Sequence, residues 1–335
     1  MLEDESRERT DWGPPSQSTV AIVAIAALVV TLAFVTAFDV AVAERGIGVF
    51  EPLSPPLGTA LAVAGLITQL GDPWFLVLLA TFAYLVNSER SSIDEPRDGA
   101  FVLAVTFGAF SLIDVLKNAF AAPRPPGAAE VTIPTWLPPA LGGTFRSITT
   151  GTGYAFPSGH AIGATAVFAA LAYKLNVGSR AARWSAAGAG IVLVIASRVV
   201  LGVHYLVDVS VGVLAGLSLV AVAAAIGHRR PLRVFALGAT LGVLAVIASV
   251  LSPAGEIWSA GQWLGASLGA GVAWYAVRPS HHLDLVETLI AGVPIAIIWV
   301  VVYTTSPPLV ITMLGTAIAA GLTIFAPTVA DHLRG

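Results

Sequence analysis

Two histidines and one carboxylate have the residue types and spacing for nucleophilic and acid–base chemistry. His204 and Asp208 are four residues apart, so on a helix they share one face and the carboxylate can accept a hydrogen bond from a ring N–H. That contact fixes the tautomer and leaves the other ring nitrogen free to act as a nucleophile, a base or a metal ligand. A purely structural His–Asp pair on a membrane helix is the alternative. The second histidine, His160, could exchange a proton with a substrate.

The segment Pro157-Ser158-Gly159-His160 is typical of a helix start. The first N–H groups of a helix have no partner within it and favour an anion. Gly159 lets a ligand approach the backbone, and Ser158 adds a hydroxyl donor. An ordinary helix N-cap by Ser158 is the alternative interpretation.

Three cations stand near these groups in the predicted bundle. One apolar segment ends near Lys117, and Arg124 comes shortly after it. Another apolar segment ends at Arg198, six residues before His204. A planar guanidinium suits two phosphate oxygens at once. Three positive charges at one face repel each other unless they bind an anion. We expect Asp114, one turn before Lys117, to offset its charge.

Apolar segments of membrane-spanning length carry these residues. The chain has 335 residues, of which 56% are hydrophobic and 11% charged, far fewer charges than a soluble domain usually has. We expect an all-α membrane helix bundle with spans near residues 19–43, 73–88, 99–120, 157–176, 184–201, 204–227, 232–252, 257–277, 284–304 and 308–330. The piece from Leu57 to Leu70 is short and is expected to be interfacial or re-entrant.

Composition also limits the partners and cofactors. A net charge of -3 gives no field for nucleic acid, so the lipid bilayer is the expected surroundings and nucleic acid is not. There is no cysteine, hence no thiolate or Cys-ligated metal site. The pair His281-His282 lacks a suitably spaced third ligand except Asp284, so no metal site is predicted.

Lys and Arg concentrate in loops on one side of the predicted bundle, which places those loops in the cytoplasm. Both termini, including a solvated tail over residues 1–18, are then cytoplasmic. The histidines and the three cations fall at the non-cytoplasmic face. The loop 121–155 is rich in Pro and Gly and is expected to be either a surface loop at the lipid headgroups or a lid.

The polar residues also resemble a known three-part motif. Lys117 to Pro125 has the form K-x6-R-P, Pro157 to His160 the form P-S-G-H, and Ser197 to Asp208 the form S-R-x5-H-x3-D. This pattern is similar to that of the type-2 phosphatidic acid phosphatase superfamily, which includes lipid phosphate phosphatases, glucose-6-phosphatase and soluble vanadium haloperoxidases.

The resemblance implies a six-helix phosphatase core over residues 19–230 that needs no metal or other cofactor. About four further transmembrane helices, over residues 231–335, lie outside it and have no assigned role. It also implies that His204 attacks phosphorus, Asp208 orients it and His160 protonates the leaving oxygen. The phosphate-binding positions fall on Lys117, Arg124, Ser158, Gly159 and Arg198.

The expected activity is hydrolysis of a phosphomonoester or diphosphate through a phosphohistidine. The partner is a phosphate-bearing lipid or a polyprenyl phosphate or diphosphate. A lipid phosphotransferase, in which an alcohol replaces water, is an alternative with the same residues. A vanadate-dependent haloperoxidase and a non-catalytic anion-binding membrane protein are others. The C-terminal tryptophans, Trp258 and Trp263 among them, are expected to be interfacial or packing residues.

Overall fold

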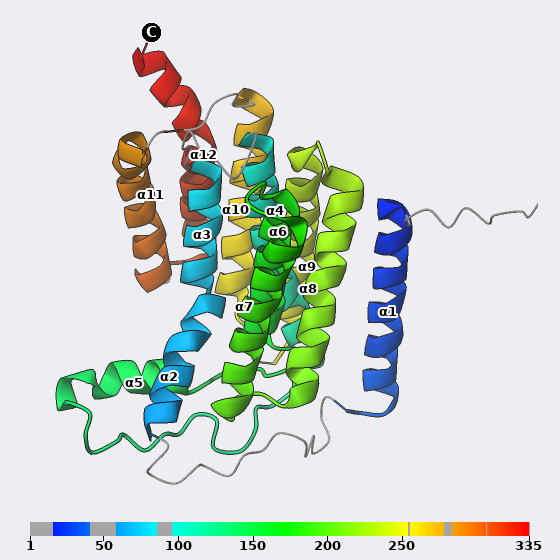
Figure 1. The fold of residues 1–335 in the computed structure, drawn as a ribbon, viewed down its shortest axis with the longest axis vertical. Helices are drawn as coiled ribbons and strands as arrows, with labels where there is room; N and C mark the ends of the chain where they lie inside the picture. Colours follow the sequence, from blue (N-terminus) through cyan, green and yellow to red (C-terminus); the bar gives the residue numbers. More distant parts are fainter. Residues whose placement is uncertain are drawn as a thin grey trace, which may run out of the picture.

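The computed structural model describes residues 16–40, 58–85, 96–253, 255–277, 283, 285–305 and 307–334. This part of the chain is an all-α polytopic bundle (Figure 1), as predicted. Its α-helices are α1 (Gln17–Ala37), α2 (Gly58–Thr68), α3 (Pro73–Leu85), α4 (Pro96–Phe120), α5 (Gly142–Thr149), α6 (Gly159–Lys174), α7 (Arg180–Val200), α8 (Leu206–Gly227), α9 (Pro231–Leu251), α10 (Ile257–Val277), α11 (Leu285–Thr305) and α12 (Leu309–Arg334). The pair His281-His282 and most of the predicted N-terminal tail lie outside the described residues.

Length and composition allow six of the described helices to cross a membrane. They are α1, α4, α7, α8, α9 and α12. A helix of 21 residues, such as α1, is about 32 Å long, close to the hydrocarbon thickness of a bilayer. The sequence predicted about ten spans. Of the rest, α6 has only 16 residues, and α10 does not qualify, because Ser259, Gln262 and Ser267 interrupt its apolar run.

The second predicted span is part of a broken helix. α2 and α3 are joined by the 3-10 turn Gln69–Gly71 and bend by 45°. Together they are long and apolar enough for one broken span or a re-entrant loop. The break places Asp72, an ionisable residue, between two apolar helices.

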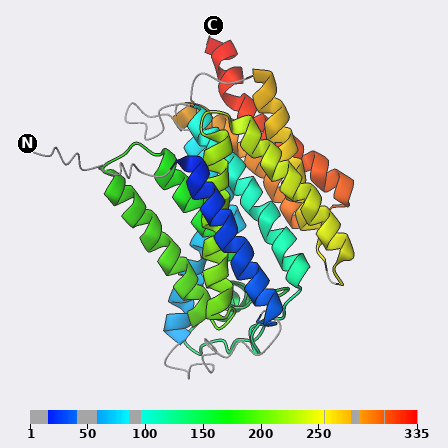
Figure 2. The ribbon, with the colours of Figure 1, turned by 90° about the vertical axis from the view of Figure 1, so that its right-hand side faces the viewer.

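Helix α4 is the centre of the bundle. In its most apolar stretch 83% of the residues are buried inside the protein, against 11% for α1. It packs against α3, α6, α8, α9 and α10. A helix that is hydrophobic all round is expected at such a position. By contrast, α1 lies at the edge of the bundle in Figure 1 and in front of the other helices in Figure 2, and it exposes Ile22, Val23 and Val30.

The contact between α6 and α8 is close because α8 has glycines at the crossing. A Cβ on Gly212 would lie 2.7 Å from the Cβ of Ala161 and 2.9 Å from the carbonyl oxygen of Ser158. The backbone N–H of Ser158 also donates to the carbonyl of Asp208 at 3.0 Å. These contacts bring the start of α6 against the start of α8, so the P-S-G-H segment and the His204–Asp208 segment lie together.

The ends of α4 and α7 and the starts of α6 and α8 meet at one end of the bundle. The start of α1 and the end of α12 lie at the other end (Figure 1). The connection between α4 and α6 crosses the first end and contains the short helix α5, which packs against α2. The segment thus contains a short helix that the sequence did not predict, and the choice between a surface loop and a lid stays a prediction.

The C-terminal helices pack directly on the rest of the bundle. α9 and α10 both contact α4, and α12 packs on α10 and reaches α3. Phe110 of α4 stacks on Trp263 of α10, with ring centroids 4.3 Å apart. Trp263 is thus a packing residue, as predicted. The hydrophobic core continues from the predicted phosphatase core, residues 19–230, into the C-terminal helices.

Candidate active site

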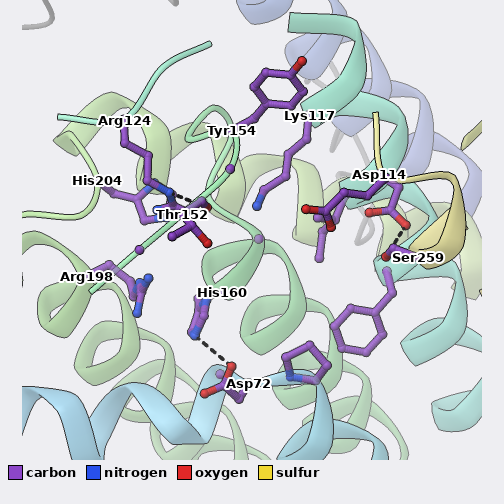
Figure 3. A pocket seen from close by; sticks show the side chains of 18 of the residues that line it. Asp72, Asp114, Lys117, Arg124, Thr152, Tyr154, His160, Arg198, His204 and Ser259 are labelled. Atoms are coloured by element: carbon purple, nitrogen blue, oxygen red, sulfur yellow. Dashed lines mark hydrogen bonds and ion pairs between the residues drawn. The ribbon is translucent and has the colours of Figure 1, made fainter. Parts of the chain in front are cut away.

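His204 lies between α7 and α8 and is 1% exposed. Its Nδ1 is 3.3 Å from Oδ2 of Asp208. The same carboxylate oxygen accepts the backbone N–H of Tyr205 at 3.0 Å. On the other side of the ring, Nη1 of Arg124 lies 3.2 Å from Nε2 (Figure 3). A guanidinium is only a donor, so Nε2 is the acceptor and the imidazole proton is on Nδ1, facing Asp208.

The protonation states around His204 suit a nucleophile. Burial, followed by the charges of Arg124, Arg198 and Lys117, lowers the pKa of His204 well below its usual value. The imidazole is therefore neutral at physiological pH and keeps a lone pair on Nε2. Burial lowers the pKa of Arg124 to about 10, which still leaves this guanidinium charged near neutrality.

His160 stands in the first turn of α6 and lines the same cavity as His204. Its Nε2 is 3.4 Å from Oδ1 of Asp72, which comes from the break between α2 and α3 (Figure 3). This Nε2 atom is buried and has no hydrogen bond of good geometry within the described part of the chain. Asp72 lies outside the three sequence motifs. Its carboxylate contacts the imidazole of His160 and helps to hold the ring in place.

Ser158 occupies the N-cap position of α6 but does not cap the helix. Its side chain accepts no hydrogen bond from the first turn. The Oγ atom is buried and unpaired among the described residues. The ordinary N-cap interpretation is therefore wrong. Gly159, next in the chain, packs against α4, where an added Cβ would lie 3.2 Å from Ile113 and 3.6 Å from Lys117.

The remaining two cations approach from α4 and α7. Arg198 is 4% exposed, and its Nη1 donates to Oγ1 of Thr68 at 2.8 Å. Its Nε is buried without a partner among the described residues. Lys117 extends from the last turn of α4 into the space between Arg124 and Asp114 (Figure 3).

One cavity of about 750 Å³ joins these groups. Of the eight site residues predicted from the sequence, those that line it are Lys117, Arg124, Gly159, His160, Arg198 and His204. Asp208 and Ser158 lie directly behind this lining, linked to each other and to His204. Residues from four helices and two loops thus converge at one cavity.

The cavity also has lining residues that sequence reasoning missed. Asp72, which separates the piece Leu57 to Leu70 from the next predicted span, was given no role from the sequence, although an ionisable residue inside an apolar stretch is itself a signal of function. Thr68 carried no such signal. From the C-terminal helices come Glu256, Trp258, Ser259, Gln262 and Trp263. The Oγ of Ser259 donates to Oδ2 of Asp114 at 2.8 Å.

Comparison with known proteins gives one match. A search of curated proteins and a search of solved structures each found nothing similar. The family model of the PAP2 superfamily matches residues 99–232. That range contains all three motifs and every predicted site residue, and it indicates a phosphatase. The part of the chain from residue 99 to residue 232, which supplies most of this cavity, is a domain of the PAP2 superfamily.

Proposed function

We propose that the protein is a membrane phosphatase that hydrolyses a phosphate ester or diphosphate of a lipid through a covalent phosphohistidine on His204. The main support is a pair of buried polar groups at the cavity that have no hydrogen-bond partner among the described residues. They are Ser158 Oγ, directly behind the lining, and Arg198 Nε, in the lining itself. Such groups are costly unless something satisfies them, and a phosphate group has the oxygens to do so.

In the first half of the reaction, the phosphate replaces His204 as the partner of Arg124. A phosphate oxygen is a charged acceptor and a stronger partner for a guanidinium than a neutral ring nitrogen. The lone pair of Nε2 is then free to attack phosphorus, and the bond from phosphorus to the leaving oxygen breaks. His160, which takes up a proton once the bound phosphate offsets the charges of Arg198 and Lys117, gives that proton to the leaving oxygen. Asp208 stabilises the positive charge that develops on His204.

In the second half, water attacks the phosphohistidine. His160, now neutral, takes a proton from the water, the N–P bond breaks, and inorganic phosphate leaves with His204 restored. Lys117, Arg124, Arg198, the amides of α6 and the hydroxyl of Ser158 stabilise the charge on the phosphoryl oxygens throughout. This electrostatic contribution is usually the largest in phosphoryl transfer. No step requires a metal.

The apolar helices and the position of the cavity at the end of the bundle favour a substrate held at the membrane surface. The distribution of Lys and Arg favours the non-cytoplasmic face for this end of the bundle, with both chain termini in the cytoplasm. A phosphotransferase would use the same first half and differ only in the acceptor of the second half.

The test is phosphate release by purified protein from a panel of lipid phosphates and diphosphates, in a chelating buffer. We expect turnover without added metal, inhibition by vanadate, and a loss of at least 1,000-fold in His204→Ala, on the order found for removal of a nucleophile. Rapid quenching with a radiolabelled substrate should trap an acid-labile, base-stable phosphoprotein.

The matched control is His228→Ala, which removes a histidine at the other end of the bundle. It should keep turnover within a few-fold. Full activity in His204→Ala, or phosphate release that depends on a divalent metal, would overturn the proposal. Adding an alcohol acceptor tests the phosphotransferase: a phosphorylated alcohol in place of inorganic phosphate would identify transfer as the reaction.

A further inference from the structure

The cavity has a second wall of different chemistry, opposite the cations. Figure 3 shows Arg124, His204 and Arg198 on one side and Asp114 and Ser259 on the other, with Lys117 between them. The second wall is built by α4 and α10, together with the residues that lead into α10. Its polar residues are Asp114, Asn118, Glu256, Ser259 and Gln262. Three of these five come from beyond residue 232, outside the part of the chain that the family model matches.

Gln262 is the most informative residue of this wall. It is 2% exposed and lines the cavity, yet its amide has no hydrogen bond to any other residue in the described part of the chain. Because this amide faces the cavity, its oxygen can accept a hydrogen bond from a ligand held there and its NH2 group can donate one.

The wall is also the wrong place for a phosphate and for a plain alkyl chain. The carboxylates of Asp114 and Glu256 repel an anion. An alkyl chain would offer no hydrogen bond to the amide of Gln262 or to the second carboxylate oxygen of Asp114. An ammonium group would suit the carboxylates but would sit beside Lys117, which is three residues from Asp114 on the same face of α4.

Hydroxyl groups fit every part of this wall. A hydroxyl can donate to a carboxylate of Asp114 or Glu256 and accept from the amide of Gln262 at the same time. The stacked rings of Phe110 and Trp263 both line the cavity and give it an apolar surface for the carbons that bear those hydroxyls. The two walls together match a phosphate carried on a hydroxylated carbon chain.

We infer that the C-terminal helix α10 completes a leaving-group subsite, centred on Gln262 and Asp114, that selects phosphate esters whose organic group carries hydroxyls beside the phosphate. The inference rests on the proposed function for the place of the phosphate. It adds a role for the helices outside the matched domain: they determine which ester is bound, while the matched domain acts on the phosphorus.

Binding of non-hydrolysable phosphonates tests the subsite without turnover. We compare 3,4-dihydroxybutylphosphonate with butylphosphonate on the full-length protein in detergent, by isothermal titration calorimetry. The dihydroxy compound should bind about tenfold more tightly or better, as expected for hydrogen bonds to buried and charged groups. Equal affinities, or no binding of either compound at 10 mM, would overturn the inference. So would tighter binding of 4-aminobutylphosphonate, which would identify a cationic leaving group instead.

Two matched variants of α10 test whether the preference for the dihydroxy compound depends on Gln262. Gln262→Leu should abolish the preference for the dihydroxy compound and leave the affinity for butylphosphonate unchanged. Ser267→Ala is the control, because Ser267 is equally buried on the same helix but faces Gly238 of α9 rather than the cavity. Its preference should equal that of the wild type. If Gln262→Leu lowers the affinity for both phosphonates equally, the role of Gln262 is structural and the subsite is contradicted.

The result separates this inference from the proposed function. A protein that prefers the dihydroxy phosphonate but releases no phosphate from any ester has the subsite without the hydrolysis. A protein that hydrolyses esters but binds both phosphonates equally has the hydrolysis without the subsite. A dihydroxybutylphosphonate bearing a decyl tail distinguishes the source of the ligand: tighter binding identifies a membrane lipid, and unchanged binding identifies a soluble phosphorylated polyol.

Discussion

At the scale of single residues, the candidate site depends on how each histidine is held. His204 is fixed from both sides, by Asp208 at Nδ1 and by Arg124 at Nε2. His160 is held on one side by Asp72, 3.4 Å away. The two rings therefore have separate carboxylates, one from within the motifs and one from the break between α2 and α3. Such separate partners allow one histidine to stay neutral as a nucleophile while the other exchanges protons.

The protonation of His204 leads to a prediction about pH. Because burial and nearby cations depress its pKa, His204 should remain neutral in the folded protein at pH values where a free histidine is charged. In the unfolded chain it protonates near pH 6.5, so stability is present above that pH and is lost as the pH falls below it. Between pH 7 and pH 5 the melting temperature of the anion-free wild type should fall further than that of His204→Gln.

Thermal unfolding of both proteins in the same detergent measures this difference. Added vanadate should reduce the loss in the wild type, since a bound anion offsets the charge on a protonated His204. Parallel pH dependences in wild type and His204→Gln would contradict the prediction.

Asp72 gives a second prediction at this scale. Asp72→Asn keeps the shape of the side chain but removes the charge beside His160, so His160 should become a poorer acid for the leaving oxygen. The loss should be about 10- to 100-fold for an alkyl phosphate, within the range for general acid catalysis. It should be small for a nitrophenyl phosphate, whose leaving group needs no proton. Steady-state rates with both esters measure the difference, and equal losses would indicate a merely structural role.

At the scale of elements, the site depends on how closely α6 and α8 approach. Gly212 allows the start of α8 to touch the backbone of Ser158. In Gly212→Val, a branched side chain would separate the two helices and move His160 away from His204. We expect a loss of at least 100-fold in turnover, since catalysis falls steeply with misplacement of about 1 Å. Phosphate release, with circular dichroism to confirm retained helix content, measures this.

The control for this change is Gly188→Val in α7, where nothing lies within 4 Å of the added Cβ. Both variants place the same side chain on an apolar helix, so they share any general cost of valine. Comparable activity in the two proteins would show that the closeness of α6 and α8 does not matter for turnover.

The sequence was sufficient for the helical class, for most of the long helices and for the motifs. It was not sufficient for helix α5, for the joining of α2 to α3, or for contacts between distant helices. The three motifs predict His204, His160 and the cations because their spacing follows local helix geometry, and the structure brings them together. Asp72 and Gln262 could not be placed in the same way. Each reaches the cavity from a helix far away in the chain, and no local pattern indicates which helices will face each other. Polar residues make α10 less apolar than a typical membrane span. Two of them, Ser259 and Gln262, line the second wall.

At the scale of the whole molecule, the matched domain and the C-terminal helices form one bundle around α4. The helices α9 and α10 pack against α4, and α10 contributes part of the lining of the cavity. Removing the C-terminal helices would therefore expose the apolar face of α4 and open the site. The C-terminal helices therefore pack as part of the bundle and contribute residues to the wall of the cavity.

The direction of the bundle in the membrane is the last prediction. The chain contains no cysteine, so a single introduced cysteine is a unique label. Ala129→Cys lies in the exposed connection near the cavity, and Ala181→Cys lies at the exposed start of α7, at the opposite end of the bundle. Since Lys and Arg favour the cytoplasm, a membrane-impermeant maleimide added to intact cells should label residue 129 and should label residue 181 only after permeabilisation. The reverse pattern would place the cavity in the cytoplasm, where its substrate would have to come from the inner leaflet.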